Sequence, residues 1–156
     1  VGRKLAQRGG QNLQEFLGDV AAFVQKHQGH PTVGPYLAEL GAAQEALAGT
    51  AMRMLTWFQT GRIALVPLAA NRFLEMMSET AVAWMLLEGA RIAVDKLSTL
   101  PKDDASARER AFYEGKKHAA LFYARNVLPN VKKSAEVLAN EDTSAIDIPT
   151  DGFATV

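Results

Sequence analysis

Apolar residues recur at steps of three and four along most of the chain, in segments that glycine and proline residues separate. This spacing places them on one face of an α-helix. The third segment has the widest apolar face, because Met77, Trp84 and Leu86 flank its main stripe, and it is expected to be the most buried helix. The pattern predicts four helices, over residues 11–27, 35–60, 66–97 and 106–139.

The same stripes predict which side chains form the core. Large apolar residues supply most of them, and alanines such as Ala83, Ala119 and Ala120 on the inner faces permit close approach of the helices. The fourth segment carries two apolar lines. Along the chain, the residues expected to face inward are Leu13, Phe16, Leu17, Val20, Phe23 and Val24; Leu37, Leu40, Gln44, Leu47, Ala51, Met54 and Phe58; Phe73, Met76, Thr80, Ala83, Leu87, Ala90, Val94 and Leu97; Phe112, Ala119, Phe122 and Asn126; and Ala120, Ala124, Val127, Val131 and Leu138.

Proline and polar residues set the remaining boundaries. Pro129 has no N–H and its ring crowds the preceding turn, so a kink or short break is expected in the fourth helix. Residues 140–156 lose the periodicity and are expected to form an extended tail, in which Ile146 and Ile148 are available to dock. Four long amphipathic helices with short connections indicate an all-α fold, an antiparallel up-down-up-down four-helix bundle over residues 10–139. Residues 1–9 are expected to be a linker or the end of a preceding domain.

Composition narrows the class of protein. The chain has 156 residues, of which 48% are hydrophobic, enough for one domain with its own core. Lys plus Arg equals Asp plus Glu at 17 each, which argues against a nucleic-acid partner. No cysteine is present, so disulfides and thiolate sites are excluded. No apolar run reaches the roughly 18–20 residues of a membrane span. No signal peptide is visible, and a first residue other than Met indicates a piece of a longer or processed protein.

Carboxylates and histidines do not combine into a metal or acid–base site. A di-iron site in a bundle needs Glu-x-x-His pairs, and none of the three histidines has a carboxylate three residues before it. Glu75 and Glu79 lie one turn apart, but Arg72 beside Glu75 favours a solvated face over a carboxylate pair. His27 and His30 have a spacing that can bind metal, but no third ligand lies nearby, so a polar helix end is predicted.

The remaining candidates have simpler structural explanations. His118 is a conceivable phosphotransfer residue, but it is expected at the edge of the core. Gly9-Gly10 lacks the spacing of a nucleotide-binding loop and predicts a turn. Aromatic residues at helical spacing are expected in the core and not in a flavin site; they are Trp57, Phe58, Phe73, Trp84, Phe112, Phe122 and Tyr123. The residues therefore assign no catalytic, cofactor-binding or metal-binding side chain.

Two stretches nevertheless resemble a known family. The opening Val1-Gly2-Arg3-Lys4-Leu5 resembles the end of the last catalytic domain in one bacterial branch of the acyl-CoA dehydrogenases, where a glycine pair leads into an extra helical domain. Asp147-Ile148-Pro149 and Phe153 fit the tail of that domain. Its signature helix resembles Phe112-Tyr113-Glu114-Gly115-Lys116, Ala120, Phe122-Tyr123-Ala124 and Val127-Leu128-Pro129. Over essentially its whole length, the chain resembles the C-terminal extension of a bacterial FAD-dependent acyl-CoA dehydrogenase.

The resemblance implies a cytoplasmic, homo-oligomeric parent enzyme that uses FAD to oxidise an acyl-CoA at Cα–Cβ to the enoyl-CoA. The family's catalytic glutamate lies upstream of Val1, so the fragment is expected to hold no FAD and no active site. Tyr113-Glu114-Gly115 is similar to the sequence around that base, but it lies inside the fourth predicted helix. The catalytic role is therefore not assigned to Glu114.

Two functions stay open. The first is an accessory domain, inactive alone, whose partners are the dehydrogenase domains of the same or a neighbouring subunit. The second is an autonomous helical interaction module unrelated to flavin. A longer parent sequence discriminates between them, because only the first function requires complete dehydrogenase domains before Val1.

Overall fold

A computed structural model describes residues 10–154, and this part of the chain is helical with no strand. The all-α prediction is therefore confirmed, with helix bounds within two residues of those expected except at Pro129. Residues 1–9, expected to be a linker or the end of another domain, lie outside the described residues. The helices are α2 Gln11–His27, α3 Gly34–Gln59, α4 Leu65–Thr99, α5 Ala107–Asn126, α6 Pro129–Ala139 and α7 Ser144–Asp147, followed by the short 3-10 helix η2 Thr150–Phe153.

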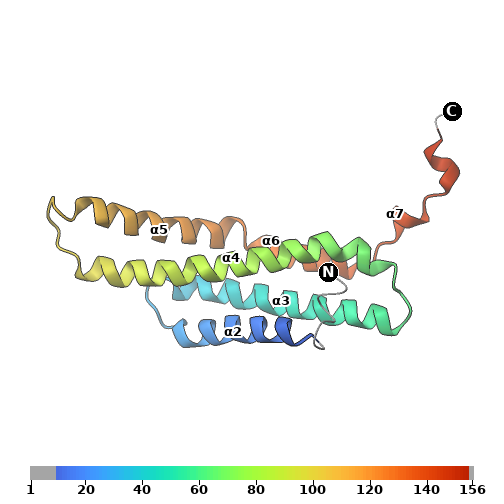
Figure 1. Cartoon of the computed structure of the whole chain (residues 1–156), viewed down its shortest axis with the longest axis horizontal. Helices are drawn as coiled ribbons and strands as arrows, with labels where there is room; N and C mark the ends of the chain where they lie inside the picture. Colours follow the sequence, from blue (N-terminus) through green and yellow to red (C-terminus); the bar gives the residue numbers. More distant parts are fainter. Residues whose placement is uncertain (1–9, 155–156) are drawn as a thin grey trace.

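The long helices pack in the order of the chain. Helix α4 runs antiparallel to α5 along its length, and α3 packs against α4 on one side and α2 on the other (Figure 1). Helix α6 continues from the end of α5 and closes over α3 and α4. Helix α2 is the outermost member, with only Val20 and Phe23 buried.

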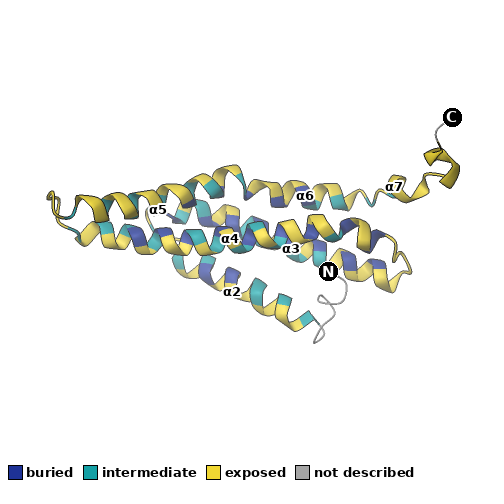
Figure 2. Ribbon diagram, turned by 45° about the horizontal axis from the view of Figure 1, so that its top comes forward, coloured by how far each residue is buried: buried dark blue, intermediate teal, exposed yellow. Residues whose placement is uncertain are grey.

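Buried residues of α2 to α6 form one hydrophobic core between these helices (Figure 2). Helix α4 contributes most to it, which confirms the prediction that this helix is the most buried. Buried Thr80 donates its hydroxyl to the carbonyl of Met76 at 2.8 Å, so its polar group is satisfied inside α4. The largest fully buried side chains are Phe73, Leu37, Leu40, Leu47, Met54, Met76, Leu87 and Leu128.

Pro129 produces the predicted break. Helix α5 ends at Asn126 and α6 begins at Pro129, where the missing N–H costs nothing. The N–H groups of Val127 and Leu128 both donate to the carbonyl of Tyr123, at 2.9 and 3.1 Å. The break turns Leu128 fully into the core.

Of the two apolar lines predicted for the fourth helix, one is largely buried and the other is exposed. Ala120 and Ala124 are buried, whereas Phe112 and Phe122 are 57% and 65% exposed and Ala119 is exposed with them. The expectation that the line of Phe112, Ala119, Phe122 and Asn126 faces the core is wrong. Helix α5 meets α4 through its alanines, which allow close approach, and no described helix covers its other side. On α3, similarly, Trp57 is buried and Phe58 points outward, which corrects the predicted stripe there.

The tail leaves the bundle at Glu141, which adopts a positive φ of 53°. Its carboxylate accepts a hydrogen bond from Trp57 Nε1 at 2.9 Å and another from Arg62, and Arg53 lies 3.5 Å away. Beyond this anchor the tail projects away from the helices (Figure 1). It contains short helical turns instead of a fully extended segment, and Ile146 and Ile148 are exposed, so they do not dock on the bundle.

Candidate functional site

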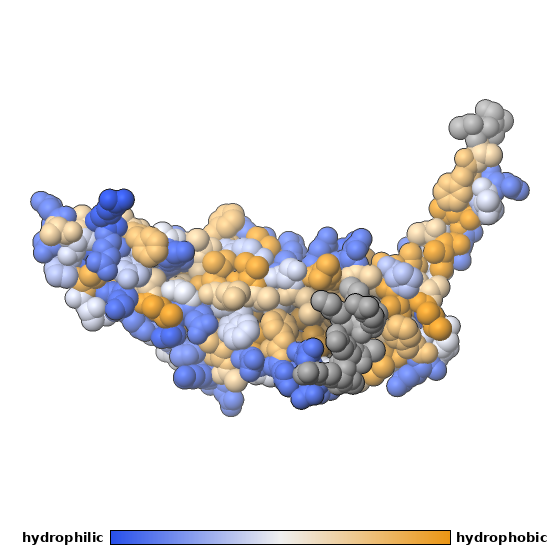
Figure 3. All heavy atoms as spheres, viewed as in Figure 1, coloured by the Kyte–Doolittle hydropathy of each residue, from blue (hydrophilic) through white to orange (hydrophobic). Residues whose placement is uncertain are grey.

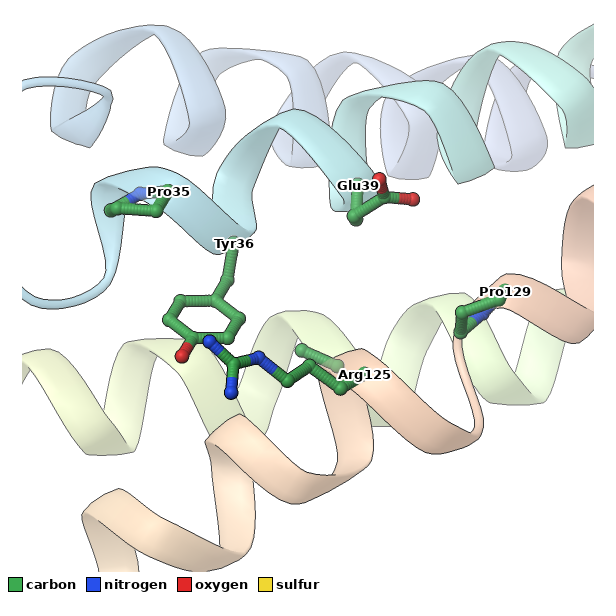
Figure 4. Close-up of a pocket in the computed structure, with 6 residues that line it drawn as sticks. Pro35, Tyr36, Glu39, Arg125 and Pro129 are labelled. Carbon is green, nitrogen blue, oxygen red and sulfur yellow. The ribbon is translucent and has the colours of Figure 1, made fainter.

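A surface pocket lies where α3 begins and where α5 is followed by α6 (Figure 4). It is open to solvent and encloses about 410 Å³. The Arg125 guanidinium lies over the Tyr36 ring, 4.9 Å from its centre, in a cation–π contact along one wall. The lining residues are Pro35, Tyr36, Glu39, Ala124, Arg125 and Pro129.

The donor set of this pocket does not fit FAD. A flavin dinucleotide needs an apolar slot for its ring and several donors for its pyrophosphate. Here the single cation of the lining, Arg125, already lies on Tyr36, and the Glu39 carboxylate on another part of the lining would repel a pyrophosphate. The expectation that the fragment binds no cofactor stays a prediction, which FAD titration tests.

Glu79 of α4 lies near the α5–α6 break and is half-buried. Burial raises the pKa of Glu79 above its ordinary value, Asn130 partly offsets this by hydrogen bonding, and the charge of Glu75 adds to the rise. Burial, together with Glu79, also raises the pKa of Tyr123. The solvated face predicted for the carboxylate pair therefore holds for exposed Glu75 but not for Glu79. These groups give a local polar cluster without a nucleophile or metal ligand set.

The histidine pair at the end of α2 serves the turn into α3. His30 is mostly buried, and its Nδ1 accepts the N–H groups of Thr32 and Val33, both at 3.2 Å. The His27 ring lies tilted against the Phe23 ring, 5.0 Å between ring centres, and burial and nearby Arg91 lower the pKa of His27. These contacts agree with the predicted polar helix end. Among residues 10–154 no group of three metal-binding side chains comes together.

His118 and Glu114 lie on the solvent side of α5. The His118 side chain is 71% exposed, so the prediction that it lies at the edge of the core is wrong. Glu114 pairs with Lys117, and this hydrogen bond lowers the pKa of Glu114. A general base that removes an α proton is more effective with a raised pKa near the working pH. The environment of Glu114 therefore gives no support for a catalytic role.

The largest feature without a partner on α5 is its exposed apolar side. Residues at steps of four and three form one exposed line, named here the aromatic face of α5: Arg108, Phe112, Gly115, Ala119, Phe122 and Asn126. Lys116 lies 5.4 Å from the centre of the Phe112 ring. Two large aromatic rings with small residues between them leave a surface on which another helix can pack closely. The periodicity of the sequence identifies four of these residues, Phe112, Ala119, Phe122 and Asn126, as one line but wrongly predicts that this line faces the core.

Within the described residues, no helix combines the length and apolar character needed to cross a membrane. Residues 16–149 match the family described as "Acetyl-CoA dehydrogenase C-terminal like". Two curated relatives are similar over 97% of this chain: a butyryl-CoA dehydrogenase of Syntrophomonas wolfei at 29% identity and the broad-specificity linear acyl-CoA dehydrogenase FadE5 of Mycobacterium tuberculosis at 27%. The aligned region is 24% and 25% of their lengths, so the chain spans about a quarter of these relatives. The helical chain belongs to the acetyl-CoA dehydrogenase C-terminal-like family.

Proposed function

We propose that this chain is the accessory C-terminal domain of a cytoplasmic, FAD-dependent acyl-CoA dehydrogenase and that it acts by packing and not by chemistry. The parent enzyme would oxidise an acyl-CoA to the enoyl-CoA, with FAD and the catalytic base in its other domains. The exposed aromatic face of α5 is the observation that carries the proposal. In the family resemblance, the signature helix includes both the buried alanines and the exposed phenylalanines.

The two halves of that helix then have separate roles. Ala120, Ala124 and Leu128 hold α5 and α6 to the bundle. Phe112 and Phe122 meet the dehydrogenase domains of the same or a neighbouring subunit. Desolvating two phenylalanine rings would contribute several kcal/mol, at about 1.5–3 kcal/mol per fully buried large apolar side chain. No specific observation in the structure favours the alternative function, an autonomous helical interaction module.

Removing this region from the parent enzyme tests the packing role. Deletion of the segment equivalent to residues 10–156 should lower the midpoint of thermal unfolding or change the assembly. Flavin binding and turnover per folded enzyme should survive. Flavin absorbance, light scattering and a dye-linked assay measure the three quantities. A truncated enzyme that assembles normally but loses its chemical step would contradict the proposal, and Glu114 would then be the first residue to substitute.

The isolated chain supplies the complementary test. Residues 1–156 should stay colourless after incubation with FAD and should show no acyl-CoA oxidation with a dye acceptor. Stoichiometric flavin binding would contradict the proposal that the chain is an accessory domain.

A further inference from the structure

The end of the bundle that holds the α3–α4 turn is both apolar and cationic. Between Ala46 and Leu74 the sequence has three arginines and no acidic residue. Two of these arginines, Arg53 and Arg62, lie on this end and reach Glu141. We name this surface the arginine end; its exposed apolar residues are Met52, Leu55, Phe58 and Ile63.

The arginine end exists because α3 is longer than its neighbour α2. Helix α2 has 17 residues and α3 has 26, and the two run antiparallel from a short turn. The side of α3 that faces α2 passes through Gly41, which contacts Val24. Counted at helical spacing from the Gly41–Val24 contact, this side reaches Met52 opposite the first turn of α2 and Leu55 just beyond its first residue. Both side chains are exposed, and no described helix covers Leu55.

The tail has the complementary character. Residues 140–154 carry four acidic side chains and no Lys, Arg or His. Ile146, Ile148 and Phe153 are exposed along it, and Figure 3 shows hydrophobic atoms along the projecting tail and around the end of the bundle from which it leaves. The first acidic residue of the tail, Glu141, already binds Trp57 and Arg62 within the same chain. The acidic side chains beyond it, Asp142, Asp147 and Asp151, meet no cation among residues 10–154.

We propose that the tail of one copy lies on the arginine end of a second copy, and that the two copies exchange tails around a two-fold axis. Each tail begins at the arginine end of its own chain, so placing two such ends together brings both tails to both acceptor surfaces. An isologous arrangement of this kind closes after two copies. Ile146, Ile148 and Phe153 would cover Met52, Leu55 and Phe58, while Asp147 and Asp151 face the arginines. This inference does not depend on the proposed contact between α5 and the dehydrogenase domains.

Association of the 156-residue chain tests the exchange. Sedimentation equilibrium over a range of protein concentrations should show a reversible dimer that weakens as salt is added. Asp147→Lys with Asp151→Lys, and separately Leu55→Glu with Phe58→Glu, should each weaken dimerisation at least about tenfold. Phe112→Glu with Phe122→Glu, on the aromatic face of α5, is the matched control and should leave the dimer unchanged. Circular dichroism confirms that each variant keeps its helix content.

A mixing experiment separates exchange from folding back. One chain carries Leu55→Glu and Phe58→Glu, so it has a tail but no acceptor surface. The other ends at Thr143, so it keeps Glu141 and the acceptor surface but has no tail. Each should be monomeric alone, and the two should form a one-to-one complex when mixed. A chain that is monomeric at every concentration, a tail that folds onto its own bundle, or a dimer broken only by the α5 control would each overturn the proposal.

Discussion

At the scale of single residues, Trp84 combines a packing role with an unsatisfied polar group. Its ring meets Phe16 of α2 edge-on, with 6.1 Å between ring centres, but its indole N–H is buried without an acceptor among residues 10–154. Trp84→Phe keeps most of the ring contact and removes the donor, so unfolding free energy should change by less than about 1 kcal/mol. Trp84→Ala should lower the free energy of unfolding by about 3 kcal/mol, because it leaves a cavity between α2 and α4. Urea denaturation measures both; equal losses would mean that the N–H has a partner.

Glu79 should make the domain less stable as the pH rises. Because burial raises its pKa in the folded state, the folded chain binds this proton more tightly than the unfolded chain, whose value is near 4.5. The stabilising contribution is complete below pH 4.5 and is lost as pH rises through the folded pKa. Glu79→Gln should therefore raise the free energy of unfolding at pH 7 and have less effect at pH 4. Exposed Glu45→Gln is the control, and an equal gain from it would contradict this assignment.

At the scale of elements, the turn between α2 and α3 depends on a glycine. A Cβ at Gly34 would lie 2.5 Å from the backbone oxygen of Gln28, which cannot move aside as a flexible side chain can. Gly34→Ala should destabilise the domain by about 1–3 kcal/mol, the usual cost of overpacking. Gly49→Ala in the interior of α3 meets nothing within 4 Å and should stabilise by about 0.5–1 kcal/mol. Thermal unfolding of the two variants should shift in opposite directions, and a loss of stability for both would refute the explanation.

The anchor of the tail should release in acid. Hydrogen bonds from Trp57 and Arg62 hold the pKa of Glu141 below its ordinary value of 4.5. The stabilisation it supplies is thus present above pH 4.5 and is lost as pH falls through the lower folded pKa. In a Trp84→Phe background, Trp57 is the only tryptophan, and its fluorescence should report this release. Glu141→Ala should show the released spectrum at all pH values, and a spectrum unchanged by that substitution would disprove the anchor.

The sequence predicted elements better than it predicted which way they face. Gly and Pro residues lie near the ends of α2, α3 and α4, so the bounds of these helices can be predicted from the local sequence. Helix α5 is different, because alanines occupy one of its apolar lines and phenylalanines the other, and periodicity cannot choose between them. The structure buries the smaller residues, since close approach to α4 requires them. Glu141 gave no signal at all, because its partner Trp57 lies 84 residues away.

At the scale of the whole molecule, exposed phenylalanines on a domain with its own complete core imply that stability and docking depend on different residues. Phe112→Ser with Phe122→Ser should change the unfolding free energy of the isolated chain by no more than about 0.5 kcal/mol, as for ordinary surface substitutions. In the parent dehydrogenase the same pair should lower thermal stability or loosen assembly, because the rings would lose a buried contact.

Leu37→Ala is the matched comparison, since Leu37 is fully buried in the bundle. It should cost about 2–5 kcal/mol in the isolated chain and destabilise the parent as well. Differential scanning calorimetry of both forms measures the contrast. If the phenylalanine pair destabilises the isolated chain as Leu37→Ala does, the aromatic face contributes to the bundle itself. If the pair has no effect in either form, the dehydrogenase domains do not rest on α5, and the packing role would have to belong to another surface.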